Sequence, residues 1–325
     1  MTVRHGLVRT DLALEAREAL LQEARREVAG ITSSSRTTPH ARVTKVEVTS
    51  EAGARQLGKP PGTYITIEAP ELRQGSRTVA AEVAEVLTAE LGALADLPEK
   101  ATILVIGLGN WNATPDALGP RVVDSVMVTR HLFEYAPQEL KGGLRSVAAL
   151  APGVLGLTGI ETEEVVRGVV ERIHPDLVIA IDALAARSLE RVCTTVQLSD
   201  SGINPGSGVG NKRLGLTAAT LGTRVIAVGV PTVVHATTLA GDVLNLMLDT
   251  LTKAGDGATN LAAAFSPPQR EKLVRELLPD HWEDLFITPK EIDALIADTA
   301  RVLASGLNAA LHPSVSASQG ERYLQ

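Results

Sequence analysis

The sequence predicts a single-domain α/β protein, with a mostly parallel or mixed β-sheet flanked by helices. Two continuous apolar runs, Ile103–Ile106 and residues 177–181, are typical of strands buried on both faces of a sheet. Segments with strand and helix patterns alternate along the 325 residues, as they do in α/β proteins. Hydrophobic residues make up 44% of the chain and aromatic residues only 2%, so we expect a core of Ala, Val, Leu and Ile.

Local patterns predict the elements of the N-terminal third. Residues 12–28 are rich in helix-forming Ala, Leu, Glu and Arg, and residues 42–49 alternate apolar and polar side chains as a half-exposed strand does. The expected elements are, in order, a helix over 12–28, a polar loop over 32–40, a strand over 42–49, a turn over 58–62, a strand over 64–68 and a helix over 76–94.

The same patterns continue to the C-terminal region. We expect strands over 103–106, 146–150, 176–181, 193–198 and 224–230. The expected helices cover 118–133, 158 or 161 to 174, 238–253, 267–278 and 289–307. Residues 1–11 have the composition of a mobile tail and residues 313–325 that of a disordered tail, so the folded domain is expected to span 12–312.

Composition excludes several classes of function. The formal net charge of −7 gives no basic footprint for nucleic acid. The single cysteine, Cys193, rules out intrachain disulfides and cysteine-based metal sites, and its apolar surroundings favour a buried structural thiol. No 18-residue apolar run and no signal peptide is present, so we expect a cytoplasmic protein without membrane contact. No cofactor is expected.

Two aspartates follow buried strands at corresponding ends. Asp116 comes a few residues after Ile106, and Asp182 comes directly after Ile181. The carboxyl ends of parallel strands lie at one edge of a sheet, so the two carboxylates can meet there. A close carboxylate pair shares one proton and can activate water, while the alternative is that each aspartate caps a helix. The sequence therefore predicts either an acid–base pair or two structural caps.

Seven motif blocks along the chain carry a resemblance to a known protein family, and this resemblance favours the acid–base pair. They cover residues 9–16, 107–120, 151–162, 175–188, 200–211, 229–234 and 288–293. On these blocks the chain resembles the germination (spore) protease family, endopeptidases that initiate degradation of small acid-soluble spore proteins during spore germination. Together with the strand pattern, the resemblance favours a phosphorylase/hydrolase-like fold.

The resemblance implies a specific mechanism and assembly. The family is assigned to an atypical aspartic class, with two catalytic aspartates at the positions that match Asp116 and Asp182. One carboxylate would activate water, and its protonated partner would donate to the scissile carbonyl and then to the leaving amine. Members are homotetramers of the spore core, made as zymogens and autoprocessed by removal of a short N-terminal propeptide, here residues 1–11.

The same resemblance predicts the self-cleavage bond. The family prefers an acidic residue before the cut bond, an apolar residue after it and Ala next, and Asp11-Leu12-Ala13 fits this pattern. We therefore predict cleavage between Asp11 and Leu12. The alternative is that Asp11 only caps the first helix.

The turn Gly107-Leu-Gly-Asn110, followed by Asp116, Gly119 and Val122-Val123, more faintly resembles the hydrogenase maturation endopeptidases, which hold a divalent metal with carboxylates and a histidine. His235 follows the strand over 224–230 and would approach the same sheet edge. Asp116, Asp182 and His235 would then form a metal site for a metal-dependent endopeptidase. The simpler interpretation of His235 is a partly exposed residue near a helix start.

Glycine-rich segments supply candidate substrate-binding residues. Gly109 and Asn110 form the turn that precedes Asp116, and Gly208 lies in a loop over 199–213 whose amides could approach a substrate. Lys212 and Arg213 would attract acidic side chains of that substrate. A plain surface turn is the alternative for the second loop.

Overall fold

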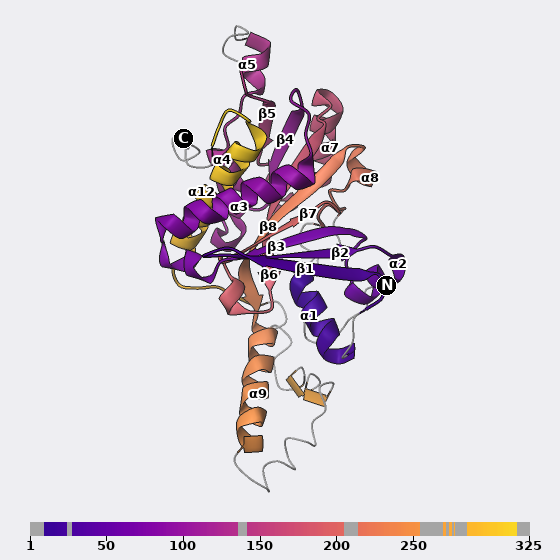
Figure 1. Cartoon of the computed structure of the whole chain (residues 1–325), viewed down its shortest axis with the longest axis vertical. Coiled ribbons are helices and arrows are strands. Elements are labelled where there is room, and N and C mark those ends of the chain that lie inside the picture. The colour runs from indigo at the N-terminus through magenta and orange to yellow at the C-terminus, as the bar shows by residue number, and fades with distance from the viewer. Residues whose placement is uncertain are drawn as a thin grey trace.

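The computed structural model describes residues 10–24, 28–135, 142–204, 214–253, 269–270, 273–274, 276 and 285–316. These residues form one mixed sheet in the order β1-β2-β3-β7-β8-β6-β4-β5, with β9 paired to β8 (Figure 1). The strands are β1 (Ile31–Thr37), β2 (Arg42–Val48), β3 (Gly62–Glu68), β4 (Thr102–Gly107), β5 (Ser146–Leu150), β6 (Leu177–Ala186), β7 (Thr195–Ser199), β8 (Arg224–His235) and β9 (Phe286–Ile287).

Parallel and antiparallel pairing divide the sheet into two halves. Strands β8, β6, β4 and β5 are parallel to one another, while β1, β2, β3, β7 and β8 pair antiparallel. The larger helices are α1 (Ala13–Ala24), α2 (Glu51–Leu57), α3 (Arg77–Ala95), α4 (Leu118–Ser125), α5 (Arg130–Tyr135), α7 (Thr162–Ile173), α9 (Ala236–Lys253) and α12 (Ile292–Leu311). Two short helices are α6 (Leu155–Thr158) and α8 (Ala218–Leu221).

Alternate side chains of β4 enter separate cores, as a strand buried on both faces requires. Ile103 and Val105 pack with α3, α4 and α12 on one face of the sheet. Leu104 and Ile106 pack with α7 and α8 on the other. A third core lies between α1, α2 and the antiparallel strands β1 to β3. The predicted α/β class with a mixed sheet and flanking helices is confirmed.

Several predicted boundaries are wrong. Most of the polar segment 32–40 is not a loop, because residues 32–37 belong to strand β1, which pairs with β2. The expected helix 118–133 is two helices, since the backbone turns extended at Val126. Strands β6 and β8 run several residues beyond their apolar stretches, so Asp182 lies within β6 rather than after it. The short helix α2 was not predicted.

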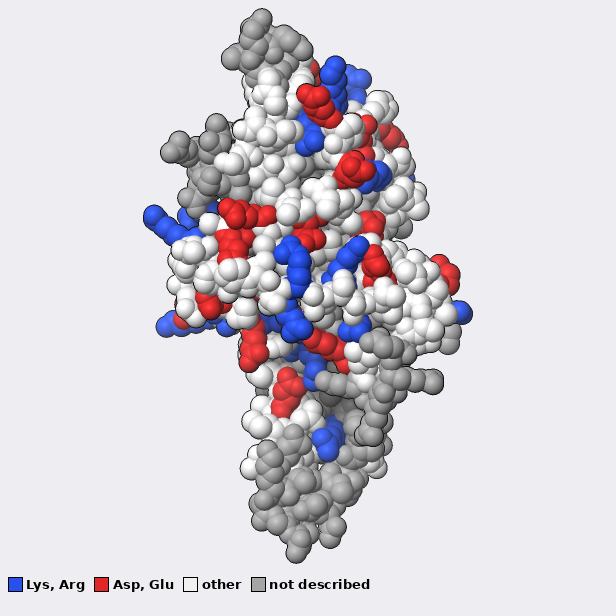
Figure 2. All heavy atoms as spheres, in the orientation of Figure 1, with Lys and Arg blue, Asp and Glu red and all other residues white. Residues whose placement is uncertain are grey.

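The terminal segments contact the sheet body where the structure describes them. Ser314 donates from its backbone N–H to the Gly143 carbonyl, and Val315 is buried, so the start of the expected disordered tail contacts the body of the protein. Helix α9 extends away from the sheet, at the lower end of Figure 1. Acidic and basic side chains are interspersed over the described part of the face in Figure 2. No helix among the described residues is long and apolar enough to cross a membrane.

Candidate active site

The floor of the candidate site is a row of three residues across the sheet. Asp182 of β6 pairs with Gly229 of β8, and Gly229 pairs with Gln197 of β7. Paired residues point to the same face, and two strand spacings put the outer Cα atoms about 10 Å apart. Because Gly229 has no side chain, the space between the carboxylate of Asp182 and the amide of Gln197 stays open apart from Leu184, which packs over the glycine.

A glycine contact brings the loop of Asp116 to this row. A Cβ on Gly119, in the first turn of α4, would lie 2.7 Å from the Ile181 carbonyl oxygen, and one on Gly107 would lie 2.2 Å from the Gly119 oxygen. Helix α4 therefore packs directly on the ends of β4 and on β6. Asp116 ends a short 3₁₀ helix, Thr114–Asp116, just before α4.

The predicted substrate-binding residues Gly109 and Asn110 shape the loop of Asp116. Gly109 has φ of +115°, and the Asn110 N–H donates to the Asp116 carbonyl oxygen at 3.0 Å. The Asn110 side chain accepts from the Asn112 N–H at 2.9 Å. These contacts fix the backbone that carries the carboxylate, and a substrate-binding role for either residue stays a prediction.

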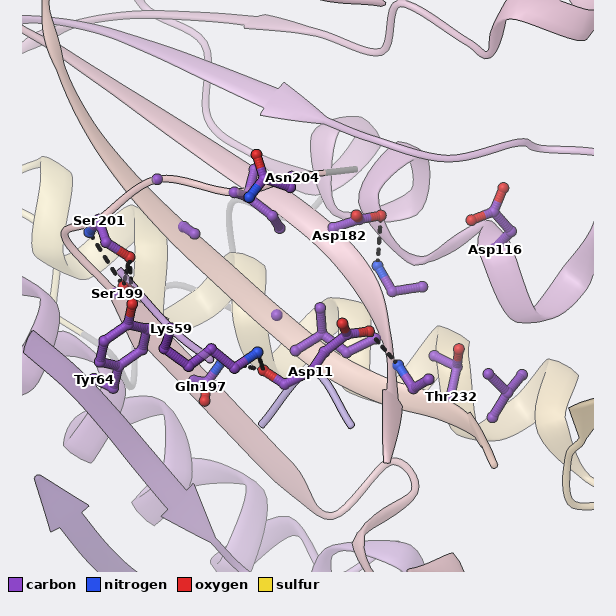
Figure 3. Close-up of a pocket in the computed structure, with 18 of the residues that line it drawn as sticks. Asp11, Lys59, Tyr64, Asp116, Asp182, Gln197, Ser199, Ser201, Asn204 and Thr232 are labelled. Carbon is purple, nitrogen blue, oxygen red and sulfur yellow. Dashed lines mark hydrogen bonds between the residues drawn. The ribbon is translucent and has the colours of Figure 1, made fainter. Parts of the chain in front are cut away.

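Asp116 and Asp182 line one pocket of about 420 Å³. Figure 3 shows the two aspartates on neighbouring elements along one side of it. Asp182 is only 6% exposed, and its Oδ1 accepts from the Ala183 N–H at 2.9 Å. The pocket thus combines two carboxylates with both apolar and polar walls, a setting in which carboxylates can exchange protons with a reacting group.

Asp11 lies in the same pocket, although it comes from the N-terminal segment. Its backbone N–H donates to the Ala185 carbonyl oxygen at 3.0 Å, and its Oδ2 accepts from the Ala185 N–H at 2.9 Å. Strand β6 therefore holds Asp11 by main chain and side chain together, three residues after Asp182. The following Leu12 is fully buried.

Lys59 and Gln197 also reach this pocket, and sequence reasoning missed both. Lys59 lies in the loop between α2 and β3, and its Nζ donates to the Asp11 carbonyl oxygen at 2.8 Å. The residue is half-buried overall, but desolvation of its ammonium lowers the pKa of Lys59, opposed by the carboxylates of Asp11 and Glu15. The sequence pattern of Gly58–Gly62 predicts only a turn. The lysine within this turn was the one feature that could have pointed to a role for Lys59.

The opposite wall of the pocket is a hydrogen-bonded group on β3 and β7. The Tyr64 hydroxyl donates to the Pro60 carbonyl oxygen at 2.8 Å and accepts from Ser201, which also contacts Ser199. Burial raises the pKa of Tyr64 to about 12, so this phenol stays protonated at neutral pH. The wall is neutral and fixes the loop that carries Lys59.

His235 is not placed as the metal alternative requires. It is 1% exposed, ends β8 and packs against Phe286 with ring centroids 4.6 Å apart, so it is not the partly exposed residue that was expected. It follows Gly229 by six residues, which is about 20 Å along a strand. Among the described residues no three His, Cys, Asp or Glu side chains gather as a metal-binding group.

Three further candidates, Gly208, Lys212 and Arg213, lie outside the described residues. The remaining prediction about chemistry concerns Cys193, which is buried at 1% exposure. Burial raises the pKa of this thiol to about 12, as expected of a structural cysteine.

Comparisons with known proteins agree over nearly the whole chain. A family model described as germination protease matches residues 8–268 and 259–324. A germination protease of Caldanaerobacter subterraneus is 47% identical over 98% of both chains. Proteins of the same name are 44% identical in Clostridium perfringens, over 98% of this chain and 99% of the relative, and 41% identical in Bacillus subtilis, over 97% and 96%.

Proposed function

This chain belongs to the germination protease family, and we propose that it cleaves small acid-soluble spore proteins in the spore core during germination, with Asp116 and Asp182 as its catalytic pair. The family makes it a peptidase. The observation that carries the aspartate pair is that both carboxylates, far apart in the sequence, line one pocket.

The proposed reaction is water attack on a peptide carbonyl. One carboxylate of the pair is ionised and takes a proton from water, while the other is protonated and supplies a proton to the leaving amine. Coupled carboxylates share their titration, so the two roles belong to the pair. No metal is part of this mechanism.

We further propose that the chain is a zymogen that cuts its own Asp11–Leu12 bond. Support comes from the position of Asp11, which bonds to Ala185 of β6 through its backbone N–H and its carboxylate. Its carboxylate accepts from a backbone N–H there, a contact that a substrate with an acidic residue before the cut bond can repeat. Removing residues 1–11 would open this position to substrates.

A homotetramer is part of the same proposal. Helix α9 exposes Val243, Leu246 and Met247 at 60%, 69% and 53%, and exposed apolar patches of this kind often mark contacts between subunits. Light scattering of the purified protein tests the assembly. A monomer at micromolar concentration would refute it.

The decisive experiment compares the intact chain with Asp116→Asn and Asp182→Asn, each with and without a chelator. Cleavage is measured on a purified small acid-soluble spore protein and on the chain's own N-terminal segment. Each substitution is expected to lower the rate by at least about 100-fold, because general acid–base groups contribute 10²–10⁴-fold. Full activity of either variant refutes the pair, and loss on chelation of the wild type favours a metal-dependent peptidase.

A further inference from the structure

The carbonyl oxygen of Asp11 is held by two side-chain donors. Lys59 Nζ lies 2.8 Å from it and Gln197 Nε2 lies 3.2 Å from it. This oxygen belongs to the Asp11–Leu12 peptide, the bond that the proposed self-cleavage would cut. Two convergent donors on one carbonyl oxygen are the arrangement that stabilises an oxyanion in acyl transfer.

Both donors are fixed by contacts that leave their N–H groups aimed at this oxygen. Gln197 is 9% exposed, and its Oε1 accepts from the Ala13 N–H at 2.7 Å, so its amide is oriented with Nε2 toward Asp11. Lys59 precedes Pro60, and the Tyr64 hydroxyl donates to the Pro60 carbonyl oxygen, which fixes the loop that carries Lys59. Figure 3 shows Lys59 and Gln197 converging on Asp11 within the pocket that holds Asp182.

We propose that Lys59 and Gln197 form the oxyanion site of this peptidase, a role that rests on the proposed function. Both are catalytic residues in this account because they touch the reacting carbonyl. The site serves self-cleavage first, and it serves substrate cleavage once residues 1–11 have left.

The bond changes balance with the groups present. Water oxygen bonds to the Asp11 carbonyl carbon and loses a proton to the ionised aspartate, while the carbonyl π pair moves onto oxygen. Lys59 and Gln197 stabilise that oxyanion. When the carbonyl reforms, the C–N bond breaks and the Leu12 nitrogen leaves with a proton from the protonated aspartate. The products are a carboxyl group on Asp11 and an amine on Leu12.

If Lys59 and Gln197 hold the oxyanion, the protonated aspartate has a different role in the reaction. A carbonyl oxygen has two lone pairs, and the two donors use both. The protonated aspartate then has no need to donate to the carbonyl oxygen, so its proton remains for the leaving amine. The cationic donor is the stronger of the two, because charge-assisted hydrogen bonds are about twice as strong as neutral ones.

The test measures the first-order rate of Asp11–Leu12 cleavage in the intact chain by mass spectrometry. Lys59→Met removes the donor and keeps the aliphatic stem, Lys59→Arg restores a cationic donor, and Gln197→Glu keeps the acceptor for Ala13 but removes the N–H. The control is Lys45→Met, on the exposed side of β2. Removing one donor is expected to slow cleavage about 100-fold or more, with Lys59→Arg faster than Lys59→Met and Lys45→Met unchanged.

A docking measurement separates transition-state stabilisation from simple positioning. Hydrogen exchange of residues 10–13 is compared between Asp116→Asn and the double variant Asp116→Asn with Lys59→Met, in which the segment stays attached. Slow cleavage with retained protection supports the oxyanion site. Slow cleavage with lost protection makes Lys59 a docking contact only and overturns the inference. A rate for Lys59→Met within threefold of wild type, or a wild-type chain that never cuts this bond, also overturns it.

Failure of the proposed function gives a different pattern. If Asp116→Asn and Asp182→Asn cleave as fast as wild type while Lys59→Met is slow, the aspartate pair is wrong and the oxyanion site stands. In that case the exchange comparison is made at short times, before cleavage.

Discussion

Gly109 controls where the carboxylate of Asp116 lies. Its φ of +115° is a conformation that L side chains rarely adopt, and a Cβ there would lie 1.9 Å from the Asp116 carbonyl oxygen. Any side chain at this position must therefore displace the backbone of Asp116.

We predict that Gly109→Ala lowers peptidase activity by at least about 10-fold, because displacement of a catalytic group by 1 Å can cost 10²-fold. The free energy of unfolding is expected to fall by about 1–3 kcal/mol, the cost of a strained backbone. Activity assays and urea unfolding measure the two effects. The matched control is Gly168→Ala in α7, where an added Cβ meets no atom within 4 Å. It should keep full activity and gain about 0.5–1 kcal/mol, and equal behaviour of the two variants would contradict the argument.

At the scale of elements, the parallel half of the sheet was predictable and the antiparallel half was less so. Strands β4 and β6 are buried on both faces, so their apolar runs mark them directly. Strand β1 has six exposed residues of seven, and its polar sequence carries no strand pattern. The break between α4 and α5 also escaped prediction, because no glycine or proline marks it. The Met127 N–H there donates instead to the side chain of Asn308, which is far away in the sequence.

Thr129 connects that break to β5. It is 2% exposed, its hydroxyl donates to the Arg145 carbonyl oxygen at 2.5 Å, and it accepts from the Val147 N–H at 3.0 Å. Thr129→Val is expected to lower the free energy of unfolding by about 1–3 kcal/mol, since the buried N–H and carbonyl lose their partner. Thr250→Val, on the exposed side of α9, is the control and should change stability by less than about 0.5 kcal/mol. Equal midpoints in urea for both variants would refute this role.

At the scale of the whole molecule, the sequence predicted the residues of the parallel edge and missed those that other elements bring to it. Asp116 and Asp182 were predicted to lie together because the strands before them were expected to end at one sheet edge. Strand β4 does end there, beside Ile181, although β6 continues past Asp182. Lys59 and Gln197 were not found, because their approach depends on the register of β3, β7 and β8, which the sequence pattern does not specify. The location of Asp11 likewise depends on a contact with Ala185 that no local pattern encodes.

His312 makes the stability of the whole molecule depend on pH. It is fully buried, its Nδ1 accepts from the Arg145 N–H at 3.3 Å, and its Nε2 donates to the Met127 carbonyl oxygen at 3.1 Å. Burial lowers the pKa of His312, the charge of Arg145 lowers it further, and the bond to Met127 opposes the shift. The folded state thus holds a neutral imidazole that joins α12 to the segments before α5 and β5.

The sign of the pH effect follows from that shift. An unfolded chain takes up a proton at this histidine once the pH falls below about 6.5, while the folded chain resists it, so folding free energy is lost as the pH falls. The loss from one such group reaches at most about 1.4 kcal/mol per pH unit. We predict that His312→Gln, which keeps a donor for Met127 but cannot titrate, loses less stability than wild type between pH 7.5 and pH 5.5. Urea unfolding at the two pH values measures both losses. The variant starts from lower stability, so the comparison is of the two pH differences, and equal differences would show that other groups carry the acid sensitivity.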